Sequence, residues 1–94
     1  MSRVFRIVPS SRFKGDVEEM VERDPDFIEI LERCNAILKL DPYNIGRQHQ
    51  IKKLTDVNPG EGQWRIRAGR YRLRYDIDGD TVILYSFRHR KEAY

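Results

Sequence analysis

The sequence predicts an α+β domain in which a helical hairpin packs on one face of a small, mainly antiparallel sheet, in the order β-α-α-β-β-β. Two observations carry this prediction. Apolar residues recur with helical spacing over residues 13–40, and from Trp64 they alternate with basic residues, as side chains of a strand do. The 94 residues, of which 39% are hydrophobic and 35% charged, suit a single soluble domain over residues 1–94.

The N-terminal part of the chain predicts a short strand and a first helix. Residues 4–8 are rich in β-forming residues, and Pro9 ends the segment. Ser10 or Ser11 can then cap a helix, because a serine hydroxyl accepts a hydrogen bond from a free backbone N–H of the first turn. An apolar stripe extends this helix to about Arg23.

A second helix follows directly, with Asp24 expected as its N-cap and Pro25 at its first helical position. Its apolar stripe runs to about Leu40 and contains the only cysteine, Cys34, which we expect to be a small core residue. The two helices are expected to pair with their apolar sides toward the sheet. The stretch from 41 to 63 is less regular, and no strand is predicted there.

The C-terminal stretch predicts three adjacent antiparallel strands. Gly69 allows a reversal between the first two, and Asp78-Gly79-Asp80 is a hairpin turn signal. The third run, residues 81–87, is almost wholly apolar, as expected of a strand covered on both faces. The arginines that share the polar parity of the first two strands are Arg65, Arg67, Arg70, Arg72 and Arg74. Several guanidinium groups are therefore expected on one face of the sheet.

The net charge of +3 hides an asymmetry between the two halves of the chain. Residues 47–94 carry 11 basic and 6 acidic residues, a net charge of +5, whereas residues 1–46 carry 7 basic and 9 acidic residues, a net charge of −2. A basic half suggests a polyanionic partner, although a solvated sheet face is the plainer alternative. The shared parity of five arginines favours the polyanion, since guanidinium groups bind phosphate oxygens in bidentate fashion.

Aromatic residues lie among the arginines, and unpaired bases could stack on Trp64, Tyr71, Tyr75, Tyr85 or Tyr94. The first three fall on the apolar parity and are expected in the core instead. Tyr94 follows a basic run and has no such core argument. It is therefore a candidate site residue, with a frayed terminus as the alternative.

The sequence predicts no metal site and no cofactor. His49 and His89 are 40 residues apart, and one cysteine with scattered acids gives no ligand spacing. Gly60-x-Gly62 is not followed by a helical pattern, which excludes a phosphate-binding loop. No apolar run approaches the roughly 20 residues that cross a membrane, and no leader is seen, so we expect a cytoplasmic protein.

Four short motifs stand out in the last third of the chain: Trp64-Arg65-Ile66-Arg67, Gly69 to Tyr75, Asp78-Gly79-Asp80, and His89-Arg90 with Tyr94. Together they resemble the RelE/ParE superfamily of bacterial toxins, and the order of elements fits over the full length. The resemblance implies the toxin of a type II toxin–antitoxin system. RelE-like members are endoribonucleases that cut mRNA in the ribosomal A site without a metal: the 2′-hydroxyl attacks the adjacent phosphate, and the 5′-oxygen leaves.

The resemblance also implies roles for individual residues. Arg72 would hold the scissile phosphate, Arg88 would stabilise or protonate the leaving oxygen, and Tyr94 would stack on a base or orient the 2′-hydroxyl. The residues expected to bind RNA phosphates are Arg65, Arg67, Arg74, Arg90 and Lys91. This chain has arginine where the prototype has lysine, and a pKa above about 12 makes arginine a poor general base. His89 is a further candidate, but simple alternation places it opposite Arg88 and favours a structural role.

Two alternatives stay open on the same fold. ParE-like members inhibit DNA gyrase without nuclease activity, and a non-catalytic RNA- or protein-binding domain could use the same scaffold. The set of Arg72, Arg88 and Tyr94 favours the nuclease, which requires the two arginines to share one face. The implied partners are mRNA on the ribosome and a cognate antitoxin. The antitoxin would dock on an edge strand or beside the helices and form a toxin–antitoxin hetero-oligomer.

Overall fold

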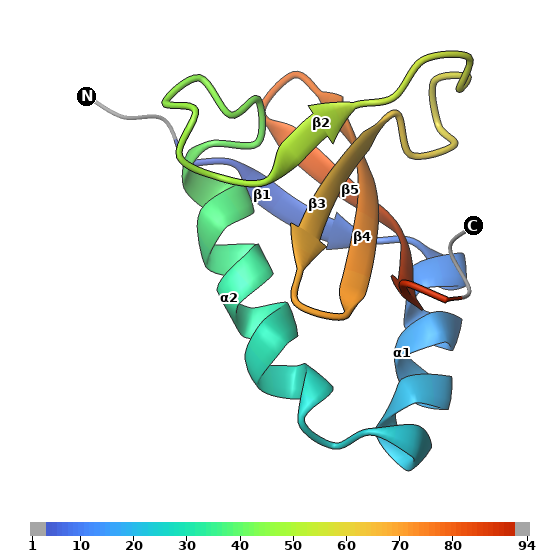
Figure 1. Cartoon of the computed structure of the whole chain (residues 1–94). Coiled ribbons are helices and arrows are strands. Elements are labelled where there is room, and N and C mark those ends of the chain that lie inside the picture. The colour runs from blue at the N-terminus through green and yellow to red at the C-terminus, as the bar shows by residue number, and fades with distance from the viewer. Residues whose placement is uncertain (1–3, 92–94) are drawn as a thin grey trace.

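In the computed structural model, residues 4–91 are described, and they form two helices and a five-stranded sheet. The elements are β1 (Arg6–Pro9), α1 (Ser11–Arg23), α2 (Phe27–Leu40), β2 (Ile51–Lys53), β3 (Trp64–Ala68), β4 (Tyr71–Asp78) and β5 (Thr81–His89). The strand order is β1-β5-β4-β3-β2, with β1 parallel to β5 and the other pairs antiparallel (Figure 1). The predicted α+β class is confirmed.

The strand β2 is an addition to the predicted order. It pairs antiparallel with β3, placing Ile51 opposite Ile66 and Lys53 opposite Trp64. Three residues, two of them lysines, are too few to display an alternating pattern, so this strand exists because β3 offers it a hydrogen-bonding edge. The prediction of an irregular segment over residues 41–63 was wrong at this point.

The first helix begins as predicted, and the second does not. The Ser10 hydroxyl accepts a hydrogen bond from the backbone N–H of Phe13 at 3.1 Å. In contrast, α2 begins only at Phe27, because the Asp24 carboxylate accepts hydrogen bonds from the Asp26 N–H and the Tyr71 hydroxyl. A contact with the sheet thus replaces the N-cap that the sequence predicted at Asp24.

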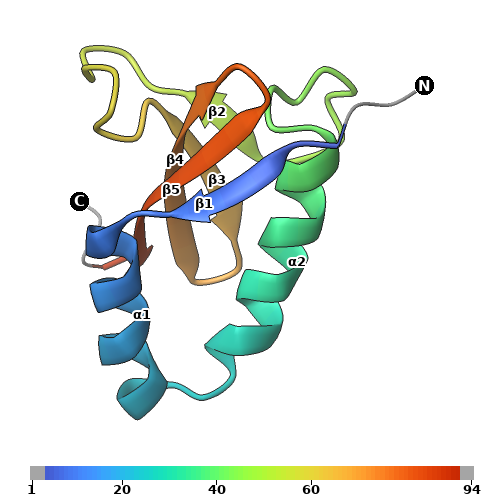
Figure 2. The same cartoon turned by 180° about the vertical axis from the view of Figure 1, so that it is seen from behind.

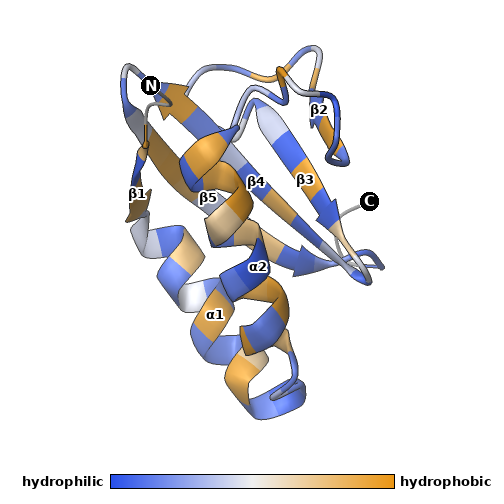
Figure 3. Cartoon of the chain, turned by 90° about the vertical axis from the view of Figure 1, so that its left-hand side faces the viewer, coloured by the Kyte–Doolittle hydropathy of each residue, from blue (hydrophilic) through white to orange (hydrophobic). Residues whose placement is uncertain are grey.

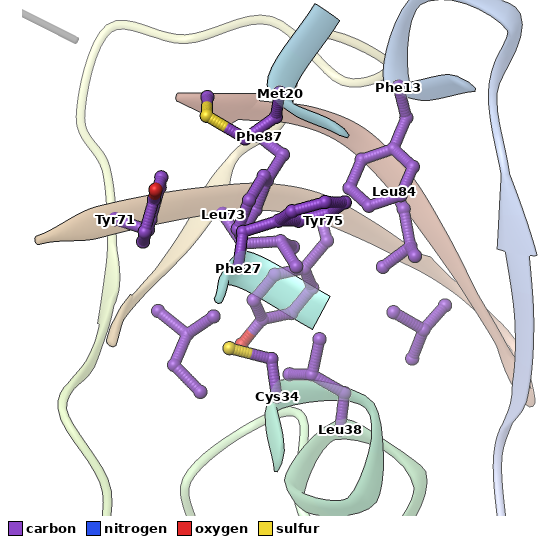
Figure 4. Packing of buried hydrophobic residues seen from close by; sticks show 12 residues of the cluster. Phe13, Met20, Phe27, Cys34, Leu38, Tyr71, Leu73, Tyr75, Leu84 and Phe87 are labelled. Carbon is purple, nitrogen blue, oxygen red and sulfur yellow. The ribbon is translucent and has the colours of Figure 1, made fainter. Parts of the chain in front are cut away.

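Both helices lie on the same face of the sheet and diverge from the turn at residues 24–26 (Figures 1 and 2). The core between the layers takes Phe13 and Met20 from α1, with further side chains from α2 and the strands (Figure 4). The Tyr71 ring stacks on Phe87 with 4.9 Å between centroids, and Cys34 is buried, as predicted. Figure 3 shows the alternation of hydrophilic and hydrophobic residues along β3 and β4. This alternation leaves the opposite, open face of the sheet to polar side chains.

Candidate phosphate-binding face

The open face carries three arginines directly beside one another. Arg67 of β3 lies opposite Arg72 of β4, and Arg72 lies opposite Arg88 of β5. We call these three residues the arginine row. Residues that face each other across strands have Cβ atoms about 4.5–5.5 Å apart, so three like charges are gathered within one short span. A parallel second row, one step along the strands, consists of Lys52, Arg65, Arg74 and Ser86.

A β-bulge in β5 interrupts the pairing between the two last strands. Tyr75 lies opposite Leu84, but the neighbouring pair is Arg74 with Ser86, so Tyr85 is an extra residue on β5. A bulge of this kind leaves one residue unpaired and bends the strand.

This bulge determines the face on which Arg88 lies. Leu84 is buried on the helix-covered face, and strict alternation from it would bring Arg88 to the same face. One inserted residue reverses the parity of everything that follows. Phe87 is consequently buried in the core, and Arg88 joins Arg72 on the open face.

Beyond the end of β1, residues at and after the N-cap of α1 form hydrogen bonds with the edge of β5 at the bulge. The Ser10 N–H donates to the Leu84 carbonyl at 2.9 Å, and the Ser10 hydroxyl donates to the Tyr85 carbonyl at 3.2 Å. Further along, the Phe87 N–H donates to a carboxylate oxygen of Asp16 at 3.0 Å. These bonds satisfy backbone groups on the edge of β5 that has no strand partner beyond the end of β1.

Asp16 also reaches the arginine row. Its second carboxylate oxygen lies 3.4 Å from Nη2 of Arg88, and its side chain is 8% exposed, against 37% for Arg88. Asp16 thus binds the backbone with one carboxylate oxygen and the Arg88 guanidinium with the other. Because this carboxylate is buried and held in place, it restricts the position of the guanidinium. No sequence pattern indicates this role, because Asp16 stands in a helix among several other acidic residues.

Arg72 is the most deeply placed member of the row, with 6% of its surface exposed. Its Nη1 donates to the carbonyls of Tyr71 at 2.9 Å and Gly69 at 3.1 Å. Its Nε is buried and finds no hydrogen-bond acceptor among residues 4–91. A buried guanidinium N–H without an acceptor is costly, and an anionic oxygen would satisfy it.

The other predicted phosphate-binding residues fall into two groups. Arg67, Arg90 and Lys91 are exposed at the end of the hairpin strands and available to a ligand. Arg74 is engaged by the chain itself, since its Nε donates to the Gly62 carbonyl at 3.0 Å and its Nη2 donates to the Glu61 carbonyl at 2.5 Å. Arg65 is half-buried in the second row.

The loop that holds Arg74 explains the Gly60-x-Gly62 motif. The Asp76 carboxylate accepts hydrogen bonds from the N–H groups of Gly60, Gly62 and Gln63 at 3.2, 2.8 and 3.1 Å. Gly62 has φ = +75°, and a Cβ there would lie 2.8 Å from Cβ of Arg74. The loop therefore folds onto the open face of β4, beside the second row.

Comparisons with known proteins identify the family to which the chain belongs. The family model described as "ParE toxin of type II toxin-antitoxin system, parDE" matches residues 7–94. The chain belongs to this family of toxins. It is thus a member of the RelE/ParE superfamily, as its motifs suggested.

Two known proteins are similar to this ParE-family chain. It is 32% identical over 65 residues to Toxin RelE3 of Methanocaldococcus jannaschii, a match that spans 69% of this chain and 66% of the relative, just under two-thirds of its length. The fold resembles that in the crystal structure of the RelB-RelE antitoxin-toxin complex from Methanococcus jannaschii, with a TM-score of 0.59 at 24% identity. That likeness covers 93% of this chain and 94% of the other. None of the helices within residues 4–91 is long and apolar enough to cross a membrane.

In this ParE-family protein, two of the three predicted catalytic residues come together on the sheet. Arg72 and Arg88 share one face, and Tyr94 lies outside the described residues. His89 lies on the helix-covered face, with its ring edge-on to Tyr71 at 5.7 Å and its Nδ1 accepting from the Lys91 N–H. Simple alternation had placed His89 opposite Arg88, and the structure agrees.

Proposed function

We propose that this chain is a toxin that cleaves mRNA on the ribosome, and that the arginine row holds the scissile phosphate. The observation that carries this proposal is the alignment of Arg67, Arg72 and Arg88 on one face, with an N–H of Arg72 that has no acceptor in the described part of the chain. The similarity to Toxin RelE3 supports the same branch of the superfamily. RelE-like toxins, which the sequence resembles, act in the ribosomal A site.

The chemistry is a transesterification that needs charge stabilisation above all. The 2′-oxygen attacks the adjacent phosphorus, the bond from phosphorus to the 5′-oxygen breaks, and the products carry a 2′,3′-cyclic phosphate and a 5′-hydroxyl. Negative charge grows on the non-bridging oxygens, where Arg72 would neutralise it, and on the leaving oxygen, which Arg88 would stabilise. Arg67, with Arg65, Arg90 and Lys91 around it, would hold neighbouring phosphates.

The proton of the 2′-hydroxyl needs a base that the arginine row does not supply, because arginine stays protonated below about pH 12. His89 lies on the opposite face and is left out of the proposed mechanism. We assign the proton to a group of the ribosome, which would make cleavage dependent on ribosomes. Tyr94 remains a proposed partner for a base or for the 2′-hydroxyl.

The expected protein partner is a cognate antitoxin that forms a hetero-oligomer with this toxin. A groove of about 330 Å³ between β1 and the helices is lined by Pro9, Phe13, Lys14, Val17, Glu18 and Leu31. No described strand pairs with the outer edge of β1, and Val8 of this strand is exposed. An amphipathic helix or an added strand would suit these two surfaces.

The proposal is tested by mapping the ends of mRNA bound to ribosomes after incubation with wild type, Arg72→Ala or Arg88→Ala. Arg33→Ala is the matched control, since Arg33 is an exposed arginine on α2 whose one ion pair within residues 4–91 is with Glu29 in the same helix. We expect cuts at the A-site codon with wild type and the control, and none with the other two variants. Intact mRNA with folded wild-type protein would overturn the proposal.

Inhibition of DNA gyrase is the second candidate function, because the matching family model is that of ParE toxins. A supercoiling assay distinguishes the two. Loss of gyrase supercoiling alongside intact ribosome-bound mRNA would assign the protein to the ParE-like activity. If both readouts stay unaffected, a non-catalytic binding domain remains.

A further inference from the structure

Tyr85 presents an aromatic ring on the open face, where the bulge has placed it. Its Cδ2 would lie 3.0 Å from a Cβ at Gly62, and its ring centroid is 5.5 Å from the guanidinium carbon of Arg74. Arg74 lies on the open face of β4, and Gly62 belongs to the loop that folds onto that face. The ring is half-buried and is not part of the core cluster.

A second guanidinium lies over the same ring. The guanidinium carbon of Arg12, in the first turn of α1, is 4.9 Å from the Tyr85 centroid. Arg12 is exposed, and its guanidinium contacts this ring. Within residues 4–91 it forms no ion pair with a carboxylate. Arg74 differs, because two loop carbonyls fix its guanidinium. One cation beside Tyr85 is therefore fixed, and the other is able to exchange its place with a ligand.

We propose that Tyr85, Arg12 and Arg74 form a subsite for an RNA base, next to the phosphate held by the arginine row. The proposal rests on the proposed function, because it takes single-stranded RNA as the ligand. Tyrosine rings and guanidinium planes are the surfaces on which proteins stack unpaired bases. The base displaces Arg12 from the ring, and the freed guanidinium contacts the phosphate of the same nucleotide.

The position of the subsite suits this role. Tyr85 precedes Arg88 by three residues on β5, which corresponds to about 10 Å at the usual rise of a strand. A base on Tyr85 and a phosphate on the arginine row can thus belong to neighbouring nucleotides. No hydrogen bond from the Tyr85 hydroxyl to any described residue ties the ring down, in contrast to the hydroxyls of Tyr71 and Tyr75.

The test measures binding of two labelled oligonucleotides of equal length by fluorescence anisotropy. One carries bases and the other is abasic, and both have 2′-O-methyl groups, so that no 2′-oxygen can attack. Tyr85→Leu should weaken binding of the base-bearing strand at least about fivefold, the lower end of what one stacked base contributes, without changing that of the abasic strand. Tyr85→Phe should bind both strands like wild type.

Two arginine variants calibrate the measurement. Arg72→Ala should weaken both strands alike, because it removes a phosphate contact. Arg33→Ala, an exposed charge on α2, should weaken neither. Circular dichroism of each variant establishes that it is folded before its affinity is compared.

Each remaining outcome decides the matter. Equal losses on both strands for Tyr85→Leu, no loss on either, or wild type that binds neither strand would overturn the subsite. Base-dependent binding through Tyr85 with intact mRNA on ribosomes would keep the subsite and remove the proposed nuclease. Cleavage on ribosomes without any Tyr85 dependence would remove the subsite alone.

Discussion

Arg72 and Leu73 are neighbours on β4 and are almost equally buried, yet they lie on opposite faces of the sheet and serve different purposes. Leu73 is 0% exposed among apolar side chains of both helices and the adjacent strands. Arg72 is 6% exposed among other arginines and retains an N–H for which the described residues supply no acceptor. Burial alone therefore does not identify a structural residue. What separates the two faces is whether the buried atoms have the partners that they need.

The largest expected effects come from replacing these two residues by alanine. Arg72→Ala should lower the cleavage rate by about 10²–10³-fold, as the loss of one preorganised donor does, with little change in the free energy of unfolding. Leu73→Ala should lower the free energy of unfolding by about 2–5 kcal/mol through the cavity it leaves. Denaturant titrations and ribosome cleavage assays measure both. Equal destabilisation by the two substitutions would break the distinction between the faces.

Asp16 links the two faces, and replacing it should have the next largest effect. Asp16→Ala leaves the buried Phe87 N–H without an acceptor, which costs about 1–3 kcal/mol of unfolding free energy, and releases Arg88. Asp16→Asn keeps an acceptor for that N–H but removes the charge beside Arg88. We expect both variants to cleave about 10- to 100-fold more slowly, with most of the lost stability restored in the asparagine variant. Unchanged or faster cleavage by Asp16→Asn would show that Arg88 needs no such partner.

A smaller effect is expected in the loop that folds onto the open face. Gly62→Ala forces a Cβ to within 2.8 Å of Arg74 at a φ of +75°, whereas a Cβ at Gly60, with φ = +89°, meets nothing within 4 Å. Strain from φ is common to both substitutions, so their difference isolates the clash. Gly62→Ala should have a lower melting temperature than Gly60→Ala. We expect Gly62→Ala to lose about 1–3 kcal/mol of unfolding free energy. Equal melting temperatures would mean that the loop does not pack on β4.

The smallest expected effect on stability at neutral pH comes from the helix-covered face, where the Tyr71 hydroxyl donates a hydrogen bond to the Asp24 carboxylate. This contact should instead make stability depend on pH in the alkaline and acidic ranges. Burial and the Asp24 carboxylate raise the pKa of Tyr71 from 10.0 to about 12, and the hydrogen bond from Tyr71 lowers the pKa of Asp24. The folded state thus keeps the Tyr71 proton where the unfolded chain releases it, and stability should fall as the pH rises from 10 to 12. Stability from Asp24 should fall as the pH drops below its ordinary pKa of 3.8. Both slopes should flatten in Tyr71→Phe, and identical denaturation profiles would contradict the contact.

The sequence was informative wherever a local pattern decides the structure. Alternation correctly predicted that Tyr71 and Tyr75 are buried and that Arg67 and Arg72 share the other face. The strand β2 and the displaced start of α2 were missed, because a three-residue edge strand and the bond from Asp24 to Tyr71 depend on tertiary partners.

The face of Arg88 could not be predicted from β5 alone. An apolar run followed by arginine does not reveal where an extra residue lies, and the bulge at Tyr85 is held by Ser10 and Asp16 from a distant part of the chain. The Gly60-x-Gly62 motif likewise acquires its meaning only once Asp76 is seen to bind it.

The most direct test of the central claim, that the arginine row stabilises attack of a 2′-oxygen on phosphorus, is to identify the chemical ends of the RNA products. Wild type should leave a 2′,3′-cyclic phosphate on one fragment and a 5′-hydroxyl on the other, and Arg72→Ala should yield neither product in the same time. Fragments with a 5′-phosphate, or the same products formed at an unchanged rate by Arg72→Ala, would contradict the account.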